Sequence, residues 1–159
     1  MINEHNDIDN DDFNKGVISR EIIINASIDD VFVAITDANK LTQWFPDIVN
    51  LEPKEGGKVE FQFLKEKSEN LDKDYHVIGK IIKIIPNKEL SYSWRHKDNP
   101  DFPDTVVSWK LEQLDKSKTR VILTHRGFTD KDKQEYENHS QGWSWFLTRL
   151  YNFVTKGES

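Results

Sequence analysis

The sequence contains no cysteine, and this absence excludes disulfide bonds, zinc–thiolate sites and thiol nucleophiles. Its only methionine is the first residue. No apolar run approaches the roughly 20 residues that a membrane-spanning helix needs. The acidic start also has the wrong charge for a secretion signal. We therefore expect a soluble, cytoplasmic chain that does not insert into a membrane.

Positive charge is missing from the first twelve residues. Five acids lie there: Glu4, Asp7, Asp9, Asp11 and Asp12. The rest of the chain is nearly neutral, so it lacks the clustered Lys and Arg of a nucleic-acid-binding surface or an anionic-membrane surface. Because residues 1–15 are polar and show no periodicity, we predict a flexible acidic N-terminal extension followed by a single domain at residues 16–157.

Two short helices are predicted after a first strand at residues 17–25. Ser27 and Asp30 have the spacing of a capping box, which indicates a helix start. Asp37 can cap a second short helix, predicted to end at Trp44 and Phe45 because Pro46 prevents its continuation.

A series of strands follows, and the chain closes with a long helix. Alternating apolar residues predict strands at residues 59–63, 75–85, 90–95, 107–112 and 121–126. A second capping-box spacing at Thr129 and Asp132 begins a helix whose apolar residues recur every three or four positions as far as Val154. Gly157 lies where a C-terminal cap is expected. Because the apolar stripe of this helix must be buried against a sheet, the pattern predicts an α+β fold.

The order of these segments resembles a known superfamily. The resembling residues are Val31–Asp37 with Leu41, Trp44 and Phe45; Gly56 and Gly57; Gly79–Ile81 with Pro86, Leu90, Tyr92 and Trp94; Val107–Leu111; Leu123–Phe128; and His139 with Gly142 and Trp143. Together they span about residues 17–155. The chain resembles the helix-grip (SRPBCC) superfamily of START and birch-pollen-allergen-like domains, in the branch named for the activator of the 90-kDa heat-shock protein ATPase. The resemblance implies a curved antiparallel sheet wrapped around the long C-terminal helix, often enclosing an apolar cavity.

Thirteen residues are candidates for lining such a cavity, because strand alternation or helical spacing turns them inward. They are Trp44, Phe61, Phe63, Tyr92, Trp94, His96, Trp109, His125, His139, Trp143, Phe146, Leu147 and Leu150. The alternative is that they form a filled core, the usual fate of aromatics in phase. Trp94, Trp109 and Trp143 are our candidates for ligand contact. Trp44 is interpreted as either a gate at the mouth or an anchor of the second helix.

The histidines do not predict a metal site. None of His5, His76, His96, His125 and His139 is spaced as H-x-x-x-H or H-E-x-x-H. Strand phase turns His96 and His125 inward and His76 toward water. The inward imidazoles are either structural or ligand-contacting. No phosphate-binding glycine motif or nucleophile elbow is present, so no cofactor and no catalytic residue is predicted.

Three functions fit the resemblance. The first is a non-catalytic module that binds a small apolar or aromatic ligand between sheet and helix. The second is a chaperone cofactor that acts through its surface on a chaperone partner. The third is a polyketide cyclase- or dehydratase-like enzyme that uses Tyr92, His125 or His139 as acid or base. The ligand and the oligomeric state are left open by the sequence.

Overall fold

The structure is a computed structural model, and it describes residues 8–67 and 71–156. Its helices and strands, with η for a 3₁₀ helix, are β1 (Ile8–Asp9), η1 (Phe13–Lys15), β2 (Val17–Ile24), α1 (Ile28–Thr36), α2 (Ala38–Leu41), β3 (Ile48–Leu51), β4 (Lys58–Phe63), η2 (Lys65–Lys67), β5 (Tyr75–Ile85), β6 (Glu89–His96), β7 (Thr105–Asp115), β8 (Lys118–Arg126), η3 (Asp130–Asp132) and α3 (Lys133–Lys156).

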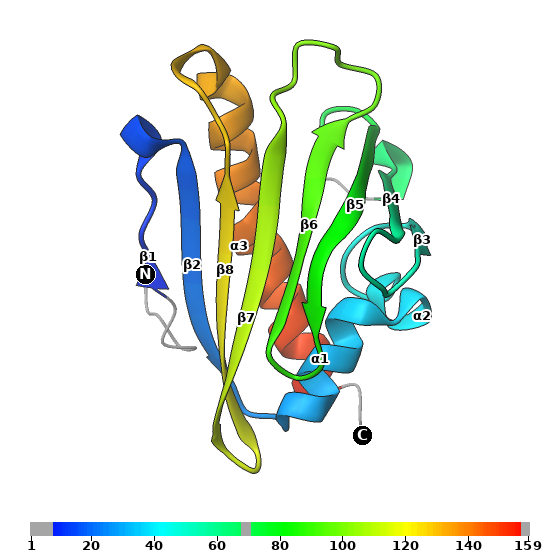
Figure 1. Ribbon diagram of the computed structural model, residues 1–159, viewed down its shortest axis with the longest axis vertical. Helices are drawn as coiled ribbons and strands as arrows, with labels where there is room; N and C mark the ends of the chain where they lie inside the picture. The colour runs from blue at the N-terminus through cyan, green and yellow to red at the C-terminus, as the bar shows by residue number, and fades with distance from the viewer. Residues whose placement is uncertain (1–7, 68–70, 157–159) are drawn as a thin grey trace.

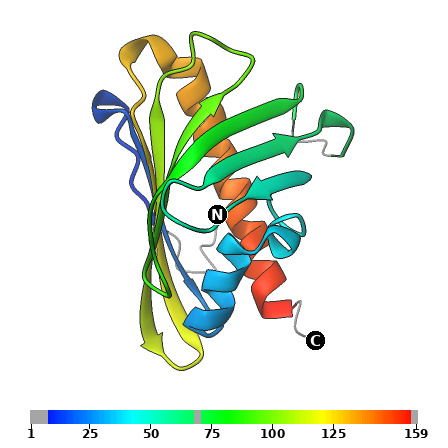
Figure 2. The same cartoon turned by 45° about the vertical axis from the view of Figure 1, so that its right-hand side comes forward.

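The strands form one antiparallel sheet in the order β1-β2-β8-β7-β6-β5-β4-β3 (Figure 1). The sheet curves around α3, while α1 and α2 lie at one end of the grip (Figure 2). The predicted α+β helix-grip fold is therefore confirmed. β3 was not predicted from the sequence. It pairs with β4 at the edge of the sheet, where half of its residues stay exposed.

Local capping explains where the helices begin. The Ser27 side chain accepts a hydrogen bond from the Asp30 amide, and that of Asp37 accepts one from the Lys40 amide. Both N-caps were predicted. However, α2 ends at Leu41 and not at Trp44. The Trp44 indole lies beyond the helix and donates to the Ala34 carbonyl of α1 at 2.9 Å. Trp44 is fully buried, which supports the anchor interpretation.

The start of α3 also follows the sequence prediction. The Thr129 amide and hydroxyl both donate to Asp132 Oδ2, at 2.7 Å each, in the turn that leads through η3 into α3. The buried stripe of α3 consists of Tyr136, Trp143, Leu147, Leu150 and Val154. The predicted C-terminal cap at residue 157 lies outside the described residues.

Strand β5 approaches β6 very closely at Gly79. A Cβ atom built on Gly79 would lie 1.8 Å from the Ser93 carbonyl oxygen, so only glycine fits there. The next amide, of Lys80, donates to the Ser93 hydroxyl at 2.9 Å. This irregular contact lies in the strand pair that forms one side of the pocket described below.

The sequence predicts a flexible extension at residues 1–15, and the structure places residues 8–15 of it against β2 and α3. β1 pairs with β2, Asp12 bridges to Val17, and Phe13 packs edge-on against Tyr136 of α3. Residues 1–7 lie outside the described part. We call residues 8–15 the N-terminal strap.

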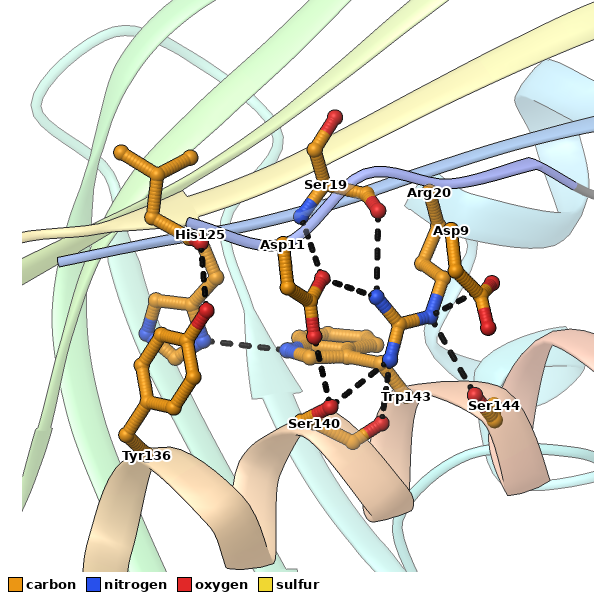
Figure 3. Close-up of polar contacts among 10 residues, drawn as sticks. Asp9, Asp11, Ser19, Arg20, His125, Tyr136, Ser140, Trp143 and Ser144 are labelled. Atoms are coloured by element: carbon orange, nitrogen blue, oxygen red, sulfur yellow. Dashed lines mark hydrogen bonds and ion pairs between the residues drawn. The ribbon is translucent and has the colours of Figure 1, made fainter. Parts of the chain in front are cut away.

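The strap is held by a buried arginine on the inner face of β2 (Figure 3). Arg20 lies in phase with Ile18 and Ile22, and only 4% of its side chain is exposed. Its guanidinium pairs with Asp9 and Asp11 of the strap. On α3 it donates to the Ser140 hydroxyl and carbonyl, at 2.9 and 2.8 Å, and to the Ser144 hydroxyl at 3.2 Å. The cluster therefore ties strap, sheet and helix together.

Candidate functional site

A cavity of about 290 Å³ opens between α3 and the inner face of β4, β5 and β6. This volume lies at the small end of the range for ligand pockets, about 300–1,000 Å³. The pocket is lined by Phe45, Phe63, Leu71, Asp72, Tyr75, Val77, Trp94, His96, Asn138, His139, Gln141, Gly142, Trp143 and Phe146.

Aromatic rings make up most of the apolar wall. Trp143 of α3 packs against both Phe45 and Trp94, with ring centroids 5.4 and 5.6 Å away, and these two rings also contact each other at 6.1 Å. Phe63 of β4 faces Phe146 of α3 at 5.5 Å. These separations are typical of packed aromatic pairs. The apolar side of the pocket is therefore formed by aromatic rings that pack against one another.

Gly142 leaves room on the helix side of the pocket. A Cβ atom built on Gly142 would have no heavy atom within 4 Å, although the residue lies inside a 24-residue helix. Glycine at such a position destabilises a helix by roughly 0.5–1 kcal/mol relative to alanine. α3 thus carries a destabilising residue at the place where a larger side chain would point into the pocket.

Hydrogen bonds fix the tautomer of His125 beneath the pocket. The Thr105 hydroxyl donates to the Trp94 carbonyl at 2.5 Å, so its oxygen accepts from His125 Nε2 at 2.8 Å. His125 Nδ1 accepts from the Trp143 indole at 3.0 Å, because an indole N–H only donates (Figure 3). His125 is therefore neutral, and both of its nitrogens are engaged.

His139 and His96 are fixed in the same way. His139 Nδ1 donates to the Glu135 carbonyl at 2.7 Å, which leaves Nε2 as an acceptor. This Nε2 accepts from the Trp94 indole at 3.3 Å and from His96 Nε2 at 3.2 Å. His96 is therefore protonated on Nε2, and its Nδ1 carries a lone pair.

Burial keeps all three imidazoles neutral. It lowers the pKa of His96 to about 3 and that of His139 to about 4, with the neighbouring histidine adding to the shift of His96. Burial also lowers the pKa of His125 far below its usual value. The polar floor of the site therefore carries no positive charge at neutral pH.

The mouth of the pocket is acidic. The Tyr75 hydroxyl donates to Asp72 Oδ1 at 2.8 Å, and this bond lowers the pKa of Asp72. Burial, together with the same bond, raises the pKa of Tyr75. Behind the mouth, burial raises the pKa of Glu135, whose Oε1 has no hydrogen-bond partner in the described part of the chain.

Six of the thirteen sequence-predicted residues lie around this pocket: Phe63, Trp94, His96, His139, Trp143 and Phe146. The other seven do not line it: Trp44, Phe61, Tyr92, Trp109, His125, Leu147 and Leu150. All seven are buried. The Trp109 indole, for example, donates to the Tyr92 hydroxyl at 3.0 Å in the closed part of the core. His76, predicted to face water, is half-buried beside Glu60.

Sequence reasoning missed several lining residues, and some had a usable signal. Asn138 and Gly142 are one helical turn apart and border the stripe that contains His139 and Trp143. Because they lie next to these inward residues on the helix, both could have been predicted to border the same space. Asp72 carried no such signal, because it lies in the charged segment before β5.

No group of three or more His, Asp or Glu residues able to hold a metal ion occurs among residues 8–67 and 71–156. Within the same ranges, no helix is both long and apolar enough to cross a membrane.

Comparison with known proteins identifies the family. The family model described as Activator of Hsp90 ATPase homolog 1-like protein matches residues 25–155. The chain belongs to this family. The match begins before α1 and ends within the last turn of α3, so it includes every residue that lines the pocket. Among curated proteins, none matches at the required significance.

Solved structures share the fold of this Activator of Hsp90 ATPase homolog 1-like chain at low sequence identity. CalU16 from Micromonospora echinospora is 23% identical over 89% of this chain and 78% of its own, with a TM-score of 0.68. The Aha1 dimer from Colwellia psychrerythraea is 23% identical over 90% and 98%, with a TM-score of 0.72. A protein from Arthrobacter aurescens is 15% identical over 94% and 91%, with a TM-score of 0.78. These similarities show the helix-grip fold alone.

Proposed function

We propose that this chain binds a small, largely apolar aromatic molecule in the pocket between α3 and strands β4–β6. The observation that carries the proposal is the combination of an aromatic wall with Gly142, which leaves the helix side of the pocket open. Ligand pockets are typically concave and apolar, with a few polar groups that orient the ligand. Trp94 and Trp143 are the proposed contacts for the flat faces of the ligand.

The histidines support binding better than catalysis. Both nitrogens of His125 and of His139 are engaged in hydrogen bonds within the protein. His125 and Tyr92 do not line the pocket, so neither is placed to exchange a proton with a molecule there. The cyclase-like alternative therefore lacks a positioned acid or base among the three residues proposed for it.

The test uses the neutral fluorescent probe N-phenylnaphthylamine, titrated into wild-type protein and two leucine variants. Gly142→Leu places a side chain in the pocket, and we expect it to weaken binding more than tenfold. Glu137→Leu adds the same side chain to an exposed position of α3 and should leave the affinity unchanged. Thermal unfolding shows whether each variant is folded. Equal affinities of Gly142→Leu and wild type, or no binding by the wild type, would refute the proposal.

A second candidate, a chaperone cofactor, is favoured by the family match over residues 25–155. Its test is the ATPase rate of a 90-kDa heat-shock protein with and without the chain. Stimulation that survives in Gly142→Leu would assign that activity to the surface and not to the pocket.

A further inference from the structure

The hydrogen-bonding groups of the pocket are mostly satisfied within the protein. His139 uses both ring nitrogens. The indole N–H groups of Trp94 and Trp143 donate to His139 and His125. His96 Nδ1 is different. It has no partner in the described ranges, and it is not among the fully enclosed unpaired atoms. This nitrogen is therefore an accessible acceptor on a residue that lines the pocket.

The ring of His96 is held firmly in place. Phe102 stacks on it with centroids 4.1 Å apart and an angle of 13°, and Tyr75 packs edge-on at 5.1 Å. Its Nε2 is tied to His139. A 180° flip of the ring about its Cβ–Cγ bond would put Cε1 in the place of Nε2 and lose this bond. The acceptor is therefore pre-oriented, and a ligand that uses it does not pay to order the side chain.

The charge of the residues that line the pocket has one sign. The lining residues in the described ranges include no Lys or Arg, and the one charged group among them is Asp72. Asn138 and Gln141 contribute neutral amides. Lys73 lies at the mouth, where its Nζ is 5.4 Å from the centroid of the Tyr75 ring. Its charge already acts on Asp72, so a carboxylate in the pocket would lose its hydration and compete with Asp72 for this cation.

Resting on the binding function proposed above, we propose that the ligand is a neutral aromatic molecule whose hydroxyl or N–H group donates to His96 Nδ1, and that carboxylates are excluded. A phenol has both required properties, a flat apolar ring for the tryptophans and one donor at its edge. A fatty acid has neither. His96 then acts as a specificity-determining residue and Asp72 as the group that repels anions.

Four naphthalene probes of similar size test the proposal by calorimetric titration. They are naphthalene, a naphthol, its methyl ether and the naphthoate substituted at the same ring position. We expect the naphthol to bind roughly three- to tenfold more tightly than the methyl ether, which is the range of one net hydrogen bond. Naphthoate should bind at least tenfold more weakly than the naphthol.

Two variants separate the contributions. His96→Phe keeps a ring stacked on Phe102 but has no acceptor, so it should reduce the naphthol affinity to that of the methyl ether and leave the ether unchanged. Asp72→Asn should improve naphthoate binding and leave naphthalene unchanged. Thermal unfolding in the absence of ligand confirms that both variants fold.

The outcomes separate a failure of ligand selection by His96 from a failure of the proposed binding function. If naphthalene and the methyl ether bind as tightly as the naphthol, the pocket binds ligands but His96 selects none, and the inference is overturned. Preferential binding of naphthoate would overturn it as well. If none of the four probes binds wild-type protein, the binding function itself fails.

Discussion

The strongest structural prediction concerns Asp11, the central residue of the N-terminal strap. Its carboxylate accepts from Arg20 Nη1, from the Ser140 hydroxyl at 2.7 Å and from the Ser19 amide at 3.0 Å. In Asp11→Ala, the buried guanidinium of Arg20 loses one of its two carboxylate partners. An uncompensated buried charge costs much more than an exposed ion pair contributes.

The magnitude follows from the partners that are lost. The variant loses two hydrogen bonds from neutral donors, at about 1 kcal/mol each, and one from a charged donor, at about 1.5–3 kcal/mol. Their sum is the upper limit of the loss in unfolding free energy. The Asp11 side chain is 24% exposed and Asp9 remains beside Arg20, so water and the second acid offset part of this loss. We expect Asp11→Ala to lower the free energy of unfolding by about 2–3 kcal/mol.

The matched control is Asp9→Ala, which removes the other acid of the cluster. Asp9 is 65% exposed and makes one contact with Arg20, at 3.2 Å, so the loss should stay below about 1 kcal/mol. Urea unfolding followed by tryptophan fluorescence measures both values. Equal losses in the two variants would refute the reasoning. So would an Asp11→Ala loss that stays the same in an Arg20→Met background, because the loss must depend on the guanidinium.

Two further predictions concern the core around the pocket. Acidification from about pH 7 to pH 5 should destabilise the protein. The pKa in the folded state is about 3 for His96 and about 4 for His139, against 6.5 for an unperturbed histidine. The unfolded chain therefore binds more protons than the folded one in this range, and its free energy falls relative to that of the folded state. The slope is up to about 1.4 kcal/mol per pH unit for each histidine, and a flat urea midpoint over this range would contradict it. Trp143→Ala should lower the free energy of unfolding by about 3 kcal/mol, the low end for a buried tryptophan, because one side of the ring already borders the pocket. A loss above about 5 kcal/mol in the same urea assay would indicate a fully packed ring.

The parts of the fold that depend on neighbours in the sequence could be predicted from it. The caps at Ser27 and Asp37 act over three residues, and strand alternation acts over two. The predicted strand at residues 75–85 has the same limits as β5. The inward phase of His96 and His125 was also correct, since both are buried.

The strap could not be predicted in this way, because its contacts are remote in the sequence. The bond from Ser140 to Asp11 joins residues 129 positions apart. A signal was nevertheless present: Arg20 is a charged residue at an inward strand position, and such a charge requires acid partners. The first twelve residues offered five acids and no Lys or Arg to pair with them.

The pocket shows a second limit of pattern reasoning. The periodicity of a strand or helix predicts which side chains point inward. It is the same whether those side chains fill a core or line an open cavity. Phe61 and Phe63 both point inward from β4, yet only Phe63 borders the pocket. The difference depends on the distance between sheet and helix at each level. That distance is set by tertiary packing and not by the alternation within one strand.

Two features that weaken the fold coincide at the pocket. Gly142 lowers the intrinsic stability of α3, and neutral His96 and His139 make the core sensitive to acid. Farther along the same helix, Leu147, Leu150 and Val154 pack as an ordinary apolar stripe. Gly142 borders that stripe and lines the pocket. The strap and Arg20 attach to α3 at Ser140 and Ser144, on either side of Gly142, so they brace the helix where the pocket weakens it.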